Sequence, residues 1–199
     1  MRSTPLIAIC LLTFPGPLAA QGGWTLSLER GFTTYSEAVH DTSTPPVRLI
    51  PWHLGTYSVR VSHDGGRSGF SVALTVANGQ MGATVGDVAI LPGSGLLLLE
   101  AAPELRVRIS AASSGARLIG HAGPILDIWA PQGDDVRTAY GGMAGLTLSL
   151  PLTRRWQVAV RSDLAVTGSE ATRAEETAEV RRAKTMRRGR LALGLTRIL

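Results

Sequence analysis

The chain has 199 residues, of which 44% are hydrophobic and 18% charged, and its formal net charge is +5. This apolar fraction excludes a disordered chain. Beyond the N-terminus no run reaches the roughly 18 consecutive apolar residues of a membrane-spanning helix, which excludes a multi-pass helical membrane protein. The nearest stretch, residues 88–100, is interrupted by Pro92, Gly93 and Gly95.

The first twenty residues have the organisation of a secretory signal peptide. Arg2 supplies a positive charge, residues 5–14 form a short apolar stretch, and Leu18, Ala19 and Ala20 precede Gln21. We expect cleavage after Ala20, so that residues 1–20 are removed and residues 21–199 form one exported domain. The single cysteine of the sequence would leave with the signal peptide, and the mature domain would contain no disulfide bond.

Apolar and polar residues alternate along most of the remaining chain, which is the pattern of β-strands with one apolar face. Phe70, Val72 and Leu74, for example, alternate with Ser71 and Ala73. Residues 83–91 are interpreted as part of a folded loop, although a ninth strand there stays open. The pattern predicts eight strands, at residues 23–35, 47–62, 69–78, 96–110, 116–130, 138–151, 156–168 and 188–199.

The predicted connections alternate between long and short, beginning and ending with a long one. The short ones contain residues that tolerate tight turns, such as Gly65-Gly66 and Ser114-Gly115. An even number of strands then places both termini at the short-turn end. Transmembrane barrels have this asymmetry, with short turns on the periplasmic side and longer loops outside.

Aromatic residues of the apolar face are predicted near the strand ends. Trp24, Phe70 and Trp156 begin strands at the short-turn end, whereas Phe32 and Tyr140 lie at the other end. Aromatic rings favour the two interfaces of a membrane. Core aromatic residues of a soluble barrel would gather nearer the middle of the strands. We therefore expect these five residues to form two interfacial belts on the outer wall.

The polar face combines long charged residues with small ones such as Gly145 and Ser149, as the narrow interior of an eight-stranded barrel requires. Arginine dominates over lysine on this face, which favours buried ion pairs over a solvated surface. His121 is interpreted as a satisfied interior group. The other histidines are not assigned a role, and His40 and His63 are expected in solvated connections. The predicted interior charges are Arg60, Glu104, Arg106, Arg108, His121, Asp127, Arg161 and Asp163.

The signal peptide, the eight alternating strands and the final strand ending in residues 194–199 resemble the small outer-membrane β-barrel proteins of Gram-negative bacteria, the OmpA-barrel and OmpX-like group. The resemblance implies an all-β fold, an eight-stranded antiparallel up-and-down transmembrane β-barrel. It also implies location in the bacterial outer membrane, with both termini periplasmic, and assembly by the barrel-insertion machinery. That group usually ends in an aromatic residue, whereas this chain ends in Leu199.

The last long connection carries an acidic and then a basic segment. One interpretation is a solvated loop, in which residues 174–186 could form one or two helical turns. Another is that its basic residues contact the phosphates of lipopolysaccharide at the outer rim. The residues of this predicted contact are Arg181, Arg182, Lys184, Arg187 and Arg188.

The sequence has no distinctive catalytic spacing, no metal-ligand spacing and no phosphate-loop context, so we expect neither an enzyme nor a bound cofactor. The expected function is a monomeric outer-membrane protein with a structural or surface-interaction role and no bulk-solute pore. Its expected partners are membrane lipid and lipopolysaccharide, not nucleic acid. Two alternatives are a soluble periplasmic lipocalin-like barrel that binds an apolar ligand and, less favoured, an outer-membrane lipid-modifying hydrolase. If Trp24, Phe70 and Trp156 point inward, the lipocalin-like alternative is correct.

Overall fold

The structure is a computed structural model that describes residues 23–36, 39–41, 47–85, 88–90, 95–133, 135–168, 180–182 and 185–199. Within these residues all regular structure is β-strand, and there is no helix long and apolar enough to cross a membrane. The proposed signal peptide and Lys184 lie outside the described residues.

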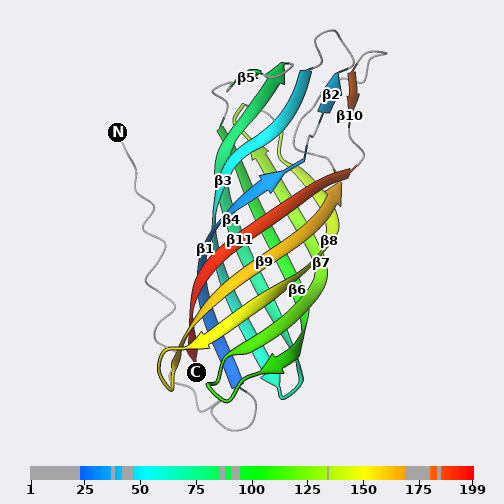
Figure 1. Cartoon of the computed structure of the whole chain (residues 1–199). Coiled ribbons are helices and arrows are strands. Elements are labelled where there is room, and N and C mark those ends of the chain that lie inside the picture. Colours follow the sequence, from blue (N-terminus) through cyan, green and yellow to red (C-terminus); the bar gives the residue numbers. More distant parts are fainter. Residues whose placement is uncertain are drawn as a thin grey trace.

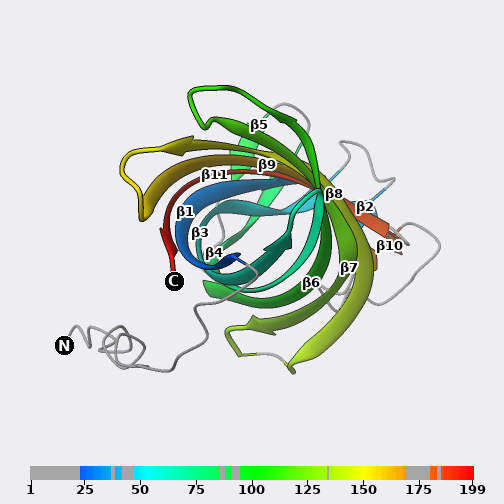
Figure 2. The same cartoon turned by 90° about the horizontal axis from the view of Figure 1, so that it is seen from below.

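Eight long antiparallel strands form a closed barrel (Figure 1). Each pairs with its neighbour along the barrel wall, and the last long strand pairs with the first, from Thr25 opposite Ile198 to Tyr35 opposite Arg188. Seen from the short-turn end, the strands surround a central lumen (Figure 2). The predicted fold class is thereby confirmed. The strands are β1 (Gly23–Tyr35), β3 (Val47–Gly65), β4 (Ser68–Val85), β6 (Gly95–Ala111), β7 (Arg117–Pro131), β8 (Arg137–Pro151), β9 (Trp156–Gly168) and β11 (Thr185–Ile198).

Three short strands extend the barrel at the long-loop end: β2 (Val39–Asp41), β5 (Val88–Ile90) and β10 (Val180–Arg182). Two of these strands, β5 and β10, lie where the sequence analysis expects a loop and a possible helical turn. Residues 83–91 are not simply a loop, since β4 continues to Val85 and β5 folds back on it as a hairpin. Residues 180–182 are not helical, because β10 pairs with β2, whose partner in turn is β3.

The short connections lie together at the opposite end, and two of them turn on glycine. Gly66 and Gly115 have φ of 88° and 85°, a left-handed conformation that glycine adopts without steric cost. These turns join β3 to β4 and β6 to β7. Figure 1 marks the C-terminus at this same end of the barrel.

The outer wall is apolar over most of its area. Large aliphatic side chains stand on it, among them Leu105 and Leu164 with exposed fractions of 73% and 72%. A soluble barrel buries its apolar face instead. The structure therefore contradicts the lipocalin-like alternative, in which this face would line a ligand cavity.

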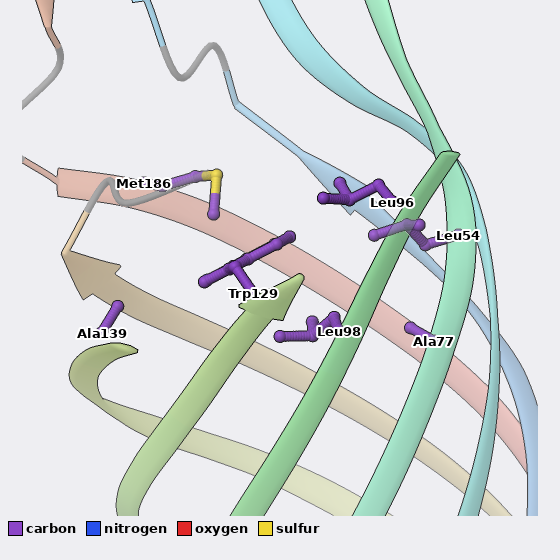
Figure 3. Packing of buried hydrophobic residues seen from close by; sticks show 7 residues of the cluster. All are labelled: Leu54, Ala77, Leu96, Leu98, Trp129, Ala139 and Met186. Atoms are coloured by element: carbon purple, nitrogen blue, oxygen red, sulfur yellow. The ribbon is translucent and has the colours of Figure 1, made fainter. Parts of the chain in front are cut away.

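The lumen is filled by side chains of two kinds. Near the long-loop end, Trp129 of β7 lies among aliphatic side chains from β3, β4, β6, β8 and β11 (Figure 3). We call this set the apolar cluster, and it consists of Leu54, Ala77, Leu96, Leu98, Trp129, Ala139 and Met186. Between it and the short-turn end, the lumen holds mainly polar and charged side chains.

Candidate functional site

A continuous series of ion pairs runs through the lumen from β1 to β7. Carboxylates and guanidinium groups alternate along it, so that every arginine contacts two acidic residues. We call this series the ion-pair network. Its members in order are Glu29, Arg60, Glu104, Arg161, Asp163, Arg190, Glu100, Arg188 and Asp127.

The part of the network nearer the short turns is centred on Glu104 of β6. Its Oε1 accepts hydrogen bonds from Arg60 Nη1 at 2.6 Å and Arg161 Nη2 at 2.8 Å, and Ser71 donates to Oε2 at 3.0 Å. Arg60 also donates through Nε to Glu29 at 2.9 Å. Glu104 thus holds two buried guanidinium groups from opposite parts of the wall.

The part nearer the long loops passes through two arginines of β11. Arg190 donates to Asp163 at 2.9 Å and to Glu100 at 3.1 Å. Arg188 pairs with Glu100 and donates to Asp127 Oδ2 at 3.0 Å. Because successive inward residues of β11 serve as these donors, the strand can only dock in one register without losing pairs.

The network as a whole cross-links β1, β3, β6, β7, β9 and β11. All nine members are less than a tenth exposed. Burying charges is costly, and a buried pair repays that cost only with good geometry and further hydrogen bonds. Arginine suits this role because one guanidinium group can donate to two carboxylates at once. The network therefore fixes how the strands face one another across the lumen.

His121 is attached to the side of this network. Its Nε2 lies 2.6 Å from Asp163 Oδ1, and Thr147 Oγ1 lies 3.5 Å from its Nδ1. Gly145 provides the space, because a Cβ there would lie 2.6 Å from both His121 Nε2 and Asp163 Oδ1.

The Thr147–His121–Asp163 order is that of a catalytic triad, but all three side chains are buried and Asp163 is already held by Arg161 and Arg190. We therefore assign His121 a structural role. The part of the chain that the structure describes also contains no group of three or more His, Cys, Asp or Glu residues arranged to hold a metal ion.

The structure brings together most of the predicted interior charges. Arg60, Glu104, Asp127, Arg161 and Asp163 belong to the ion-pair network, and His121 joins it through Asp163. The remaining two, Arg106 and Arg108, lie at the short-turn mouth, where Arg106 pairs with Asp64 at 3.1 Å.

Four members of the network were missed at the sequence level: Glu29, Glu100, Arg188 and Arg190. Arg188 was predicted to contact lipopolysaccharide at the rim, and this is wrong, because its side chain points into the lumen. The alternation of Leu191, Leu193 and Leu195, continued backwards along β11, would have placed Arg188 and Arg190 on the inner face. Of the other predicted contacts, Arg187 is exposed, and Arg181 and Arg182 lie in β10.

The predicted interfacial aromatic residues stand on the outer wall. Phe70, Trp156, Phe32 and Tyr140 are exposed, and Trp24 is half-buried. Trp24 contacts the rings of His63 and Phe70, with centroids 4.8 and 5.7 Å away. His63 is therefore not in a solvated connection as expected, but in β3, where it is part of an aromatic cluster near the short turns.

Of three comparisons with known proteins, the one with solved structures bears on the fold. No family model matches the chain, and neither does any curated protein. The solved structures of Neisserial surface protein A (NspA), of OprG from Pseudomonas aeruginosa and of the outer membrane protein AlkL, the last determined in lipid bilayers, are similar to it. For NspA the identity is 12%, the coverage 88% of this chain and 97% of that one, and the TM-score 0.58. For OprG the identity is 10%, the coverage 90% of this chain and 97% of that one, and the TM-score 0.56. For AlkL the identity is 11%, the coverage 94% of this chain and 95% of that one, and the TM-score 0.59. The chain thus has the fold of the small outer-membrane β-barrels.

Proposed function

We propose that this protein spans the bacterial outer membrane, with its long loops outside and both termini in the periplasm. The observation that carries the proposal is the apolar outer wall bordered by aromatic residues at both ends, the surface that a barrel in lipid presents. A closed barrel also pairs the backbone groups that an open sheet edge would leave unsatisfied in lipid. The similarity to outer-membrane barrels of known structure supports the same location.

Fractionation of cells that produce the full chain tests this location. We expect the protein in the outer-membrane fraction, resistant to extraction by high salt or alkaline carbonate and released by detergent. A known soluble periplasmic protein and a known outer-membrane protein serve as controls in the same preparation. Release of the mature protein by carbonate without detergent would contradict the proposal.

We further propose a structural or surface-interaction role without bulk solute flow or catalysis. The support is the filled lumen, where the apolar cluster lies above the ion-pair network. Eight-stranded barrels have interiors just wide enough for side chains. Recordings in planar bilayers should accordingly show no large and stable conductance. A large and stable conductance would refute the closed lumen, provided that it is absent from a mock preparation without the protein or is abolished by an antibody against it.

At the outer rim, the basic residues Arg181, Arg182 and Arg187 are proposed to contact lipopolysaccharide phosphates. Arg187 is exposed, and β10 brings Arg181 and Arg182 onto the short sheet beyond the barrel. Guanidinium groups bind phosphates through paired, charge-assisted hydrogen bonds.

Replacing these three residues together by glutamine should weaken binding of lipopolysaccharide to the purified barrel roughly tenfold, since each ion pair of this kind contributes modestly. The control replaces two exposed arginines at the opposite end, Arg154 and Arg155. An equal loss per removed charge in both variants would show a general charge effect and refute the contact.

A further inference from the structure

The short-turn mouth of the lumen contains a cavity of about 130 Å³. Four of its ten lining residues are arginines, and one is acidic. The arginines come from different elements: Arg67 from the β3–β4 turn, Arg106 and Arg108 from β6, and Arg117 from β7. Asp64 supplies the single carboxylate. This balance differs from that of the ion-pair network, where carboxylates outnumber arginines.

The cavity extends further into the lumen. A second, smaller space of about 30 Å³ shares Asp64, Arg106 and Arg117 with the first and reaches Arg60 and Arg161. Those two inner arginines are already paired with Glu104. The excess of positive charge is therefore concentrated at the mouth, and not deeper in the barrel.

Backbone hydrogen bonds fix the positions from which these arginines extend. The Arg108 N–H donates to the Arg67 carbonyl at 2.8 Å, which ties the β3–β4 turn to β6. The β6–β7 pairing shifts register between Arg108 and Ser110, where β6 nears its end. Arg106 is oriented by Asp64 at 3.1 Å. A site on connected strands loses less conformational freedom on binding than one on separate loops.

Size and charge together indicate the ligand. The cavity is smaller than the roughly 300–1,000 Å³ of sites for drug-sized molecules, so it suits a single small group. A phosphate monoester offers about −1.5 to −2 charges and three strong acceptor oxygens, enough for several guanidinium donors. A carboxylate has one charge and two oxygens, and matches four arginines less well.

We propose that the short-turn mouth is a phosphate-binding site in which Arg106, Arg108 and Arg117 donate to the phosphate oxygens. The ligand is a small phosphorylated molecule or the headgroup of an anionic phospholipid. Asp64 competes with the phosphate for Arg106. This site is distinct from the proposed lipopolysaccharide contact, which lies at the other end of the barrel.

The test titrates the refolded full-length mature barrel, in zwitterionic detergent, with inorganic phosphate at constant ionic strength, while NMR records the amide signals. We expect saturable shifts in β6 and at Arg117. Arg108→Gln and Arg117→Gln should each weaken the affinity roughly tenfold. The matched control is Arg155→Gln, which removes one exposed arginine at the same end that does not line the cavity. That variant should bind like the wild type.

Asp64→Asn makes the test independent of losses caused by misfolding, because it should tighten binding, by about threefold. A parallel experiment in nanodiscs with and without phosphatidylglycerol distinguishes the two sources of phosphate. Shifts of the same amides that appear with phosphatidylglycerol alone assign the site to a headgroup, whereas shifts that require added phosphate assign it to a soluble ligand. Shifts that do not saturate under either condition, equal weakening by Arg155→Gln, or unchanged binding in Asp64→Asn would overturn the proposal.

Discussion

The two halves of the lumen differ in chemistry, although a smaller apolar group, Ala73, Ala102, Ile125, Met143 and Ala165, is interspersed with the charged side chains of one half. Towards the long loops, the apolar cluster packs Trp129 against leucine, alanine and methionine side chains (Figure 3). Towards the short turns, the ion-pair network joins five carboxylates to four arginines. Both sets of side chains fill the lumen of the same barrel, but their contributions to stability depend on different properties of the residues.

In the apolar cluster, stability depends on volume, because close-packed interiors leave no space for readjustment. In the ion-pair network, it depends on partners, because a guanidinium group that loses its carboxylate remains buried and charged. A substitution that keeps the volume and removes a charge should therefore affect only the network. One that removes volume without altering charge should affect the cluster.

Glu104→Gln should have the largest effect. It preserves the size of the side chain but removes the charge that both Arg60 and Arg161 contact. Breaking a buried pair by removing one partner costs about 3–5 kcal/mol. Urea unfolding of the protein in lipid vesicles, followed by tryptophan fluorescence, measures this change in the free energy of unfolding.

The control is Asp64→Asn at the mouth of the lumen, whose loss should be smaller, because the Asp64 side chain is 27% exposed whereas that of Glu104 is fully buried. If Glu104→Gln were as stable as the wild type, the network would not be a source of stability.

Leu98→Ala should have the next largest effect, in the other half of the lumen. Leu98 is 2% exposed within the apolar cluster, and its truncation leaves a cavity. Such changes cost about 3 kcal/mol, whereas the volume-conserving Leu98→Met should cost less than about 1.5 kcal/mol. The same unfolding experiment compares the two variants. Equal losses from Ala and Met would mean that volume does not govern this half.

Gly145→Ala should lower the free energy of unfolding by a smaller amount. Gly145 lies beside His121, at the edge of the ion-pair network. The added Cβ would clash most closely with the Ser162 carbonyl oxygen and would lie 2.6 Å from His121 Nε2 and Asp163 Oδ1, and overpacking of this kind costs about 1–3 kcal/mol. Gly142→Ala on the same strand is the matched control, since its Cβ would meet only the Gly123 carbonyl, at 3.9 Å. We expect that variant to stay within about 0.5 kcal/mol of the wild type. Indistinguishable stabilities would show that the β8–β9 backbone and the His121–Asp163 contact both adjust without cost.

The eight long strands could be predicted because one physical rule governs them. The wall is apolar outside and the lumen polar inside, so the side chains alternate with a period of two. The rule weakens where the lumen itself becomes apolar. Residues 96–99 are four consecutive leucines, and Trp129 lies in a strand without clean alternation, so the apolar cluster left no distinctive pattern in the sequence.

Two further features depend on contacts between distant parts of the chain. β10 pairs with β2, a segment far earlier in the sequence, and no local pattern indicates such a partner. Arg188 and Arg190 lie in a run of basic residues that resembles a charged loop. Their inward direction follows from the register of β11 against β9, which pairs Arg190 with Asp163.

An outer wall that faces lipid around a lumen closed to lipid should expose some tryptophans to the acyl chains and shield others. Tryptophan fluorescence in vesicles of brominated lipid tests this directly, using one variant that retains only Trp156 and another that retains only Trp129, with phenylalanine at the other tryptophan positions. Trp156 stands on the wall, and Trp129 is fully buried in the lumen. We predict strong quenching of Trp156 and little quenching of Trp129. Quenching of Trp129 equal to that of Trp156, or no quenching of Trp156, would contradict the account.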